Sequence, residues 1–282
     1  MRILVTGATG FIGNHVVQEL LKHNVEVVAT SRSIEKARRY QWLSKVRYIP
    51  WDLNQNKEDN FTFFQRPDCM IHLAWEGLSD YKALLHFEKQ VPMYYNYIKN
   101  LVCHGLNHIV VLGTCLEYGM QSGCLREDME AKPTVPYSLA KDTLRKYLDQ
   151  LFTIYPVTFQ WVRLFYVHGN GQSKKSLISQ LETAIQKGER KFNMSDGEQL
   201  RDYLPVEKVA KYITAIALQE RVKGIINCCS GKPISILNFV KKYLEEKGHS
   251  IQLNLGYYPY PDYEPMAFWG DDSKLRRIIG QA

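Results

Sequence analysis

The sequence contains no apolar run near the roughly 18 residues that a membrane-spanning helix requires. It has no signal-peptide layout either, because Met1 and Arg2 lead directly into a short strand-like run that ends in glycines. No basic run or nucleic-acid-binding module accompanies the formal charge of +7. We therefore expect a cytoplasmic protein without nucleic-acid or membrane partners, whose mild positive charge suits anionic small molecules.

Metal-ligand spacing, repeats and low-complexity segments are also missing from the sequence. The six cysteines follow no metal-binding pattern and several lie in apolar runs, which predicts reduced thiols and no metal site. Of the 282 residues, 45% are hydrophobic and 23% are charged, as in ordinary globular proteins. This length is enough for one large domain, or for two lobes that share a core.

Short apolar runs alternate with helical segments through the first half of the chain. The runs are RILVT (2–6), VEVVAT (25–30), VRYIP (46–50), CMIHLAW (69–75), HIVVLGT (108–114) and VTFQWVRLF (157–165). Segments such as GNHVVQELLKH (13–23) and NYIKNLVCHG (96–105) have the helical period of about 3.6. This alternation predicts an α/β protein with a Rossmann-type, doubly wound parallel sheet.

From about residue 165 the pattern loosens into loops, one helix (SLISQLETAIQKG, 176–188) and a tail rich in tyrosine and proline. Ligands of doubly wound folds bind at the carboxyl edge of the sheet, where a second lobe can cover them. We expect a nucleotide-binding domain of residues 1–164, to which residues 202–224 return. Residues 165–201 and 225–282 are expected to form a smaller C-terminal substrate-binding lobe.

The segment VTGATGFIG (5–13) places Gly7, Gly10 and Gly13 between the first strand and the first helix. A backbone that passes close to a pyrophosphate needs glycine, and the following helix N-terminus offers it free N–H groups. The position of the motif, after a strand and before a helix, strengthens an otherwise weak signal. It predicts a dinucleotide cofactor.

The second strand ends in Ser31 and Arg32, with Arg38 and Arg39 further on, where an NAD site would carry Asp or Glu. A guanidinium pairs bidentately with phosphate, so this end predicts recognition of a 2′-phosphate and hence NADP(H). The alternative is that Arg32 is an ordinary solvated side chain.

Tyr137 and Lys141 are four residues apart in the predicted helix PYSLAKDTLRKYLDQLF (136–152), so they share one side of it. Lys141 borders the inward face, and a buried ammonium needs a partner. Beside a phenol it would lower the pKa of that phenol, so that the tyrosine exchanges a proton near neutral pH. In isolation the same spacing also fits a surface lysine and a packing tyrosine.

With these motifs the chain resembles the extended short-chain dehydrogenase/reductase family, of the NAD-dependent epimerase/dehydratase type, over nearly its whole length. The family often has His-x-Ala-Ala where this chain has HLAW (72–75), and a Ser/Thr-containing run ending in Tyr-Gly where it has GTCLEYG (113–119). YSLAK (137–141) matches the catalytic motif. VRLFYVHGNGQ (162–172) and LRDYLPVEKVAKYI (200–213) stand where the family has Arg-x-x-Asn-Val-Tyr-Gly and an Arg-Asp-(Phe/Tyr) segment.

The resemblance implies that Thr114 hydrogen-bonds the reacting oxygen, that Tyr137 exchanges the proton, and that Lys141 binds the nicotinamide ribose while tuning Tyr137. It implies cofactor contacts from Gly7, Thr9, Gly10, Phe11, Ile12, Ser31, Arg32, Asp52, Leu53, Leu73, Ala74, Trp75 and Lys141. Substrate contacts are implied for Thr114, Cys115, Tyr166, His168 and Arg201.

Several of these substrate contacts have a second interpretation. Arg201 either faces the diphosphate of the substrate or forms a surface ion pair with a nearby acid. His168 either contacts substrate or packs, and Cys115 is either a reactive thiol or a quiet small side chain. Tyr166 stands where the family often has an asparagine that helps to hold the substrate, which indicates a reshaped sugar-phosphate site.

The residues after Thr114 narrow the reaction that the resemblance implies. Cys115 and Leu116 replace the Asp-Glu pair of the 4,6-dehydratases, and Leu116 and Gly171 replace the cysteine and histidine of the epimerase–reductases that make GDP-fucose. We predict an NADPH-dependent 4-ketoreductase of a nucleotide-linked 4-keto-6-deoxy sugar, with dTDP or CDP as the nucleotide. Its product would be a 6-deoxyhexose for surface polysaccharide such as lipopolysaccharide O-antigen.

Two alternatives stay open: a nucleotide-sugar 4-epimerase with tightly bound NAD(P), and a non-catalytic NADP-sensing regulator. The regulator is disfavoured because Tyr137 and Lys141 are both present. By resemblance we also expect a homodimer, formed by the helices that contain MYYNYIKNLV (93–102) and LAKDTLRKYLDQL (139–151).

Overall fold

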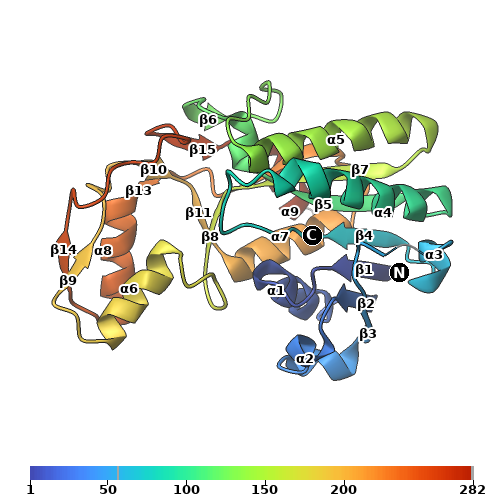
Figure 1. Ribbon diagram of the computed structural model, residues 1–282, viewed down its shortest axis with the longest axis horizontal. Helices are drawn as coiled ribbons and strands as arrows, with labels where there is room; N and C mark the ends of the chain where they lie inside the picture. The colour runs from blue at the N-terminus through green and yellow to red at the C-terminus, as the bar shows by residue number, and fades with distance from the viewer. Residues whose placement is uncertain (56, 281–282) are drawn as a thin grey trace.

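The computed structural model describes residues 1–55 and 57–280, and within them seven parallel strands form one central sheet (Figure 1). In spatial order they are β12 (Gly224–Cys228), β7 (Thr158–Leu164), β5 (His108–Thr114), β4 (Cys69–His72), β1 (Arg2–Thr6), β2 (Glu26–Ser31) and β3 (Arg47–Pro50). Every neighbouring pair is parallel. The predicted Rossmann-type sheet is therefore confirmed.

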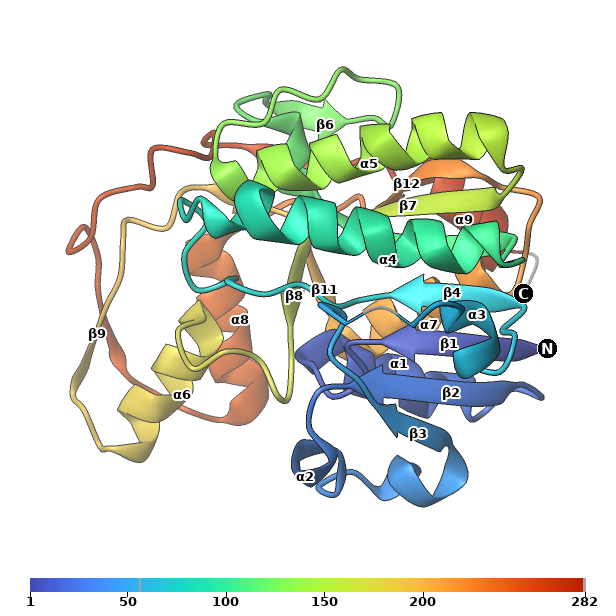
Figure 2. The ribbon, with the colours of Figure 1, turned by 45° about the vertical axis from the view of Figure 1, so that its right-hand side comes forward.

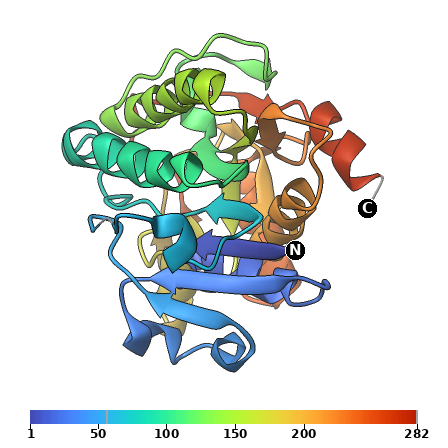
Figure 3. The ribbon, with the colours of Figure 1, turned by 90° about the vertical axis from the view of Figure 1, so that its right-hand side faces the viewer.

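Helices cover both faces of the sheet (Figure 3). One face carries α1 (Phe11–Leu20), α7 (Val206–Ala217) and α9 (Ser273–Ile279), and the other carries α3 (Asn60–Phe63), α4 (Val91–Cys103) and α5 (Pro136–Ile154). In β1, Ile3 and Val5 point into the first core and Leu4 points into the second. Burial on both sides explains why the strands read as continuous apolar runs.

Short helical turns connect these elements. They are α2 (Ile34–Ala37), the 3₁₀ turns η1 (Gln41–Lys45) and η3 (Cys115–Tyr118), and the π-helical turn η2 (His86–Gln90). Of these, η2 and η3 matter for the site, because η3 continues β5 at the carboxyl edge of the sheet and η2 leads into α4.

A second cluster of elements lies beyond the carboxyl edge of the sheet (Figure 2). Its core lies between α6 (Leu177–Gln186) and α8 (Ile236–Lys247), beside the paired strands β9 (Lys191–Asn193) and β14 (Gln252–Asn254). The chain also forms three further strand pairs within the described residues: β8 (Tyr166–His168) with β11 (Tyr203–Pro205), β10 (Leu200–Arg201) with β13 (Ile234–Ser235), and β6 (Gly123–Leu125) with β15 (Phe268–Gly270).

The predicted lobe boundary at residue 225 is wrong in one respect. Strand β12 pairs with β7 in the central sheet, and α9 packs against α7 and β12, so residues 225–228 and 273–279 lie with the sheet. The reason is burial: Ile226, Asn227 and Cys228 are fully buried, as in the other strands. The division into two lobes with different tasks stays a prediction. In the part of the chain described, no helix is both long and apolar enough to cross a bilayer.

Candidate active site

The turn between β1 and α1 has glycines at the positions where a side chain would not fit. Gly7 has φ +69°, and a Cβ on it would lie 2.8 Å from the backbone nitrogen of Ala74. A Cβ on Gly13 would lie 2.2 Å from the carbonyl oxygen of Gly7, and the Gly10 N–H donates to the same oxygen at 2.9 Å. The turn thus brings the N-terminus of α1 close to the ends of β1 and β4, as a pyrophosphate site requires.

A cavity of about 260 Å³ lies along this turn. Of the residues predicted to contact the cofactor, it is lined by Gly7, Thr9, Gly10, Ser31, Arg32, Asp52, Leu53, Leu73, Ala74 and Trp75. Three predicted residues are outside its lining. Phe11 lines a neighbouring cavity of about 220 Å³, Ile12 packs against the apolar core, and Lys141 lies behind Trp75.

Hydroxyl groups gather at the end of this cavity where β2 stops. The Thr9 hydroxyl donates to Ser31 Oγ at 2.8 Å, and Ser31 Oγ lies 2.7 Å from the Tyr48 hydroxyl. Arg32 forms an ion pair with Glu76 there, and both residues line the cavity. Since the Arg32 side chain is 62% exposed and its partner is a surface carboxylate, a phosphate could compete for it.

The other cations predicted near this end differ in position. Arg38 and Arg39 are exposed and do not line the cavity, whereas Lys36, which the sequence did not single out, lines both this cavity and the neighbouring one. The positive charge available to a phosphate therefore comes from Arg32 and Lys36.

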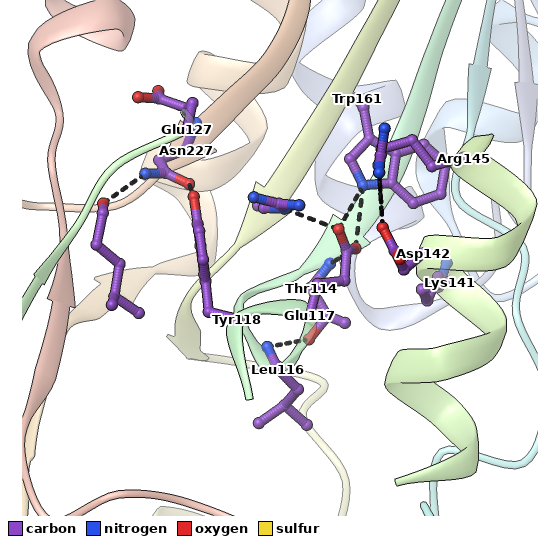
Figure 4. A network of polar contacts seen from close by, with 12 residues as sticks. Thr114, Leu116, Glu117, Tyr118, Glu127, Lys141, Asp142, Arg145, Trp161 and Asn227 are labelled. Atoms are coloured by element: carbon purple, nitrogen blue, oxygen red, sulfur yellow. Dashed lines mark hydrogen bonds and ion pairs between the residues drawn. The ribbon is translucent and has the colours of Figure 1, made fainter. Parts of the chain in front are cut away.

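At the end of β5, the opening of η3 is fixed by a capping box between Thr114 and Glu117 (Figure 4). The fully buried Glu117 carboxylate accepts from the Thr114 N–H at 2.9 Å, from the Trp161 indole at 3.0 Å and from Arg163 at 2.7 Å. These three donors come from the protein itself and occupy both carboxylate oxygens. Glu117 therefore holds Thr114 in place and is not free to move protons of a substrate.

Tyr137 lies in the first turn of α5 with its ring enclosed by three others. The Tyr81 ring stacks on it at 5.0 Å between centroids, His86 lies at 5.3 Å and Trp75 meets it edge-on at 6.0 Å. The Tyr137 N–H also donates to the Tyr81 carbonyl at 3.0 Å. All three rings come from residues 75–86, the segment that follows β4.

The structure corrects the predicted lowering of the Tyr137 pKa. Burial raises this pKa, the neighbouring Tyr81 and Glu117 raise it further, and only a hydrogen bond with the Thr114 hydroxyl lowers it. The predicted lowering by Lys141 is absent because its ammonium is directed at a backbone carbonyl and not at the phenol. The structure does bring Thr114 and Tyr137 together as predicted.

Lys141 is 3% exposed, in agreement with its predicted inward position. Its Nζ donates to the carbonyl oxygen of Leu112 at 2.7 Å and lies 3.8 Å from the centroid of the Trp75 ring. Burial lowers the Lys141 pKa to about 7, while the Glu117 charge opposes this shift. The amine is thus poised to titrate near neutral pH.

Two of the predicted substrate residues pack against other side chains of the protein, Cys115 buried and His168 partly buried. Cys115 is 5% exposed in an apolar cluster, and burial raises the pKa of its thiol, as expected for a quiet small side chain. The His168 ring packs edge-on against Phe239 at 5.0 Å, and burial lowers its pKa. The packing alternative fits both residues.

Arg201 is fully buried beside Tyr166, and both bind the same acid. The Arg201 guanidinium donates to Glu264 at 2.9 Å and to the carbonyls of Leu200 and Met266 at 2.9 and 3.2 Å. The Tyr166 hydroxyl donates to the second carboxylate oxygen of Glu264. Arg201 therefore forms an ion pair with a nearby acid, as its second interpretation states, but this pair is buried and not at the surface.

Several residues of the site escaped sequence reasoning. Glu117 could have been found, because Thr and Glu three residues apart at a strand end form a capping-box pattern. Tyr81 and Glu264 lie in irregular segments, and His86 begins the short turn η2, so no periodic signal could have placed them near Tyr137 or Arg201.

Residues 3–229 match the NAD dependent epimerase/dehydratase family. The dTDP-6-deoxy-L-talose 4-dehydrogenase (NAD(+)) of Aggregatibacter actinomycetemcomitans is 28% identical over 276 residues, which cover 96% of this chain and 99% of that protein. The CDP-abequose synthase of Salmonella typhimurium is 25% identical over 221 residues, which cover 78% of this chain and 71% of that enzyme.

Solved structures share the fold across the whole chain. The UDP-glucuronic acid 4-epimerase from Bacillus cereus, in complex with UDP-glucuronic acid and NAD, aligns with a TM-score of 0.83 and 23% identity, covering 100% of this chain and 94% of that one. A UDP-N-acetylglucosamine 4-epimerase from Methanobrevibacter ruminantium M1 aligns with a TM-score of 0.87 and 22% identity, covering 98% and 91%.

Proposed function

Because the chain belongs to the NAD dependent epimerase/dehydratase family, we propose that it reduces the C4 keto group of a nucleotide-linked 4-keto-6-deoxy sugar with NADPH. Membership confirms the family resemblance seen in the sequence. The observation that carries the proposal is the position of Tyr137, which interacts with Thr114 at the end of β5 and packs against Trp75 in the lining of the glycine-turn cavity. The named activity of the dTDP-6-deoxy-L-talose 4-dehydrogenase supports a reaction at C4 of a nucleotide-linked deoxysugar, and the name of the CDP-abequose synthase supports a nucleotide-linked product.

In this proposal the glycine turn holds the pyrophosphate and Trp75 borders the nicotinamide end of the cavity. When bound, NADPH supplies the hydride that attacks C4 of the sugar. Thr114 donates a hydrogen bond to the carbonyl oxygen, and Tyr137 gives its phenolic proton to that oxygen as the C–H bond forms, so that an alcohol results. The raised pKa of Tyr137 keeps the proton in place before the step.

The neighbours of Thr114 support a simple reduction over a dehydration. Cys115 and Leu116 supply no acid–base pair, and the Glu117 carboxylate is held by Trp161 and Arg163. Removal of water from the sugar would need a second proton-transfer group at this place. The described site offers only Tyr137 in that capacity.

For the cofactor, the proposal of NADP(H) is supported by the end of β2. Ser31, Arg32 and Lys36 line the cavity there, and no acid occupies the strand end itself. The Arg32–Glu76 ion pair would have to open for a 2′-phosphate. Cells hold NADPH mainly in the reduced form, which favours net reduction.

A nucleotide-sugar 4-epimerase with tightly bound NAD is the second candidate. The observation in its favour is the same Arg32–Glu76 pair, which satisfies the cation that would otherwise read a 2′-phosphate. A UDP-glucose 4-epimerase of Halalkalibacterium halodurans is also similar, at 24% identity over 304 residues. Both candidates use Tyr137 and differ in whether the hydride returns to the sugar.

The deciding experiment incubates the protein with NADPH or NADH and a panel of dTDP-, CDP-, UDP- and GDP-linked 4-keto-6-deoxy sugars. Stoichiometric loss of nicotinamide absorbance, faster with NADPH, is expected for the reductase, and NMR of the product gives the configuration at C4. In a parallel incubation of the corresponding 4-hydroxy nucleotide sugars without added cofactor, interconversion of the C4 epimers would contradict the reductase and support the epimerase. NADH consumed faster than NADPH would contradict the cofactor preference.

A further inference from the structure

Trp75 is held in one orientation by a chain of hydrogen bonds. Its indole N–H donates to Nδ1 of His86 at 3.1 Å, and Nε2 of the same ring lies 2.9 Å from the carbonyl oxygen of Asp80. A ring that accepts at Nδ1 and donates at Nε2 is the neutral tautomer. Since His86 is fully buried, this chain fixes the plane of Trp75.

The face of that indole covers the Lys141 ammonium. Nζ lies 3.8 Å from the ring centroid and reaches the Leu112 carbonyl at 2.7 Å on its other side. Trp75 itself lines the cofactor cavity, so it stands between this cavity and the buried amine. A desolvated ammonium over a tryptophan face is attracted by the negative charge of the π face.

We propose that Trp75 is a positioning residue whose indole face keeps the Lys141 amine charged and directed along the wall of the cofactor cavity. Burial disfavours the charged amine, and among the residues that the structure describes, Lys141 has no carboxylate as a hydrogen-bond partner. The contact with Trp75 offsets part of this cost. A ring face stabilises the ammonium without a second charge that would repel an anionic cofactor. The proposal rests on the cofactor site proposed above, whose cavity Trp75 lines.

The charged and titratable groups around Lys141 are few. Glu117, in η3, raises the Lys141 pKa through its charge, although its oxygens accept hydrogen bonds from other groups. His72, in β4, is fully buried, and burial together with the charge of Lys141 lowers its pKa to about 3, so it is neutral. Tyr137 lies one helical turn away and is protonated. Because the Lys141 pKa is near neutral, the contact with Trp75 can decide whether the amine is charged at neutral pH.

The test follows the titration of Lys141 by NMR in the full chain with ε-¹³C-lysine, its signal assigned with Lys141→Arg. Trp75→Leu keeps an apolar, though smaller, side chain and removes the π face, and should lower the titration midpoint by roughly one pH unit. Trp75→Phe keeps a ring without the N–H and should shift it less. Trp51→Leu, in the same cavity but without contact to Lys141, controls for loss of a tryptophan and should leave the midpoint unchanged.

An unchanged midpoint in a folded Trp75→Leu protein would overturn the proposal, and so would equal shifts in the Leu and Phe variants, since these would assign the effect to the indole N–H. A second route avoids substitution. Biosynthetic 5-fluorotryptophan weakens the ring face without changing its shape, and should lower the midpoint in the wild type but not in Trp75→Phe. Equal midpoints with and without fluorine would contradict the proposal. The readout needs no turnover, so it stays informative should the reductase function fail.

Discussion

Tyr137 is the residue on which the proposed chemistry depends most. Tyr137→Phe removes the phenolic proton that interacts with Thr114 but keeps the ring that packs against Tyr81 and His86. We expect turnover to fall by a factor of about 10² to 10⁴, because general acid catalysis is lost while the fold stays. NADPH binding, measured by fluorescence, should be unchanged.

The matched control for this change is Tyr147→Phe, which removes an exposed hydroxyl from the same helix. It should leave turnover at the wild-type level. Tyr137→Phe with wild-type turnover would show that the proton comes from elsewhere and would refute the assigned role.

Glu264 decides between the two interpretations of Arg201. Glu264→Gln weakens the ion pair with Arg201 and leaves the guanidinium available. If the arginine receives the diphosphate of the substrate, KM for the nucleotide sugar should fall several-fold with kcat little changed, because an internal competitor has been removed. Asp262→Asn, in the same segment but 80% exposed, should leave KM as it is.

The same variants also test the structural interpretation of Arg201. An unchanged KM together with a lower thermal midpoint would make the buried Arg201–Glu264 pair purely structural, since breaking such a pair leaves an uncompensated charge. Steady-state kinetics and thermal unfolding of the same two variants therefore suffice to separate substrate recognition from packing.

At the scale of elements, local patterns predicted the fold well. The apolar runs became β1 to β5 and β7 within a few residues, and the 3.6-residue period located α1, α4, α5 and α6, because these signals act over one or two turns. The contacts that complete the site span far greater distances along the chain. Glu117 meets Arg163 across 46 residues and Arg201 meets Glu264 across 63, and no local pattern records such pairings.

The junction of β5 and η3 depends on one of these long-range contacts. Glu117→Gln leaves the Arg163 guanidinium buried at 1% exposure without its counter-charge. Loss of one partner from a buried pair costs about 3–5 kcal/mol, so the urea midpoint should fall markedly. Glu130→Gln, which alters an exposed pair with Lys132, should cost less than about 1 kcal/mol. Similar losses in both variants would contradict a structural role for Glu117.

At the scale of the whole molecule, the sequence predicted the doubly wound sheet but misplaced β12 and α9, since their membership depends on pairing with β7 and packing on α7. The homodimer stays a prediction. It concerns α4 and α5, and α5 carries Leu139 and Tyr147 on its exposed side at 45% and 52% exposure. Sedimentation of the pure protein would show whether these faces associate.

The buried amine of Lys141 also affects the stability of the entire fold. Its pKa is about 7 in the folded protein but about 10.4 in an unfolded chain. Between these values the unfolded chain binds more protons, so the free energy of unfolding should rise with pH, by about 1.4 kcal/mol per pH unit from this group. Below pH 7 the amine is charged in both states and its full cost is present.

Lys141→Met removes this group, so the variant should be more stable than the wild type near pH 6 and should lose that advantage as the pH approaches 10. Urea unfolding at several pH values measures the difference, in which other titrating groups cancel. Lys146→Met, at 62% exposure on the same helix, controls for the introduction of methionine. A constant difference between Lys141→Met and the wild type across this range would mean that Lys141 keeps its charge in the folded protein, so that the indole of Trp75 and the Leu112 carbonyl together offset its burial.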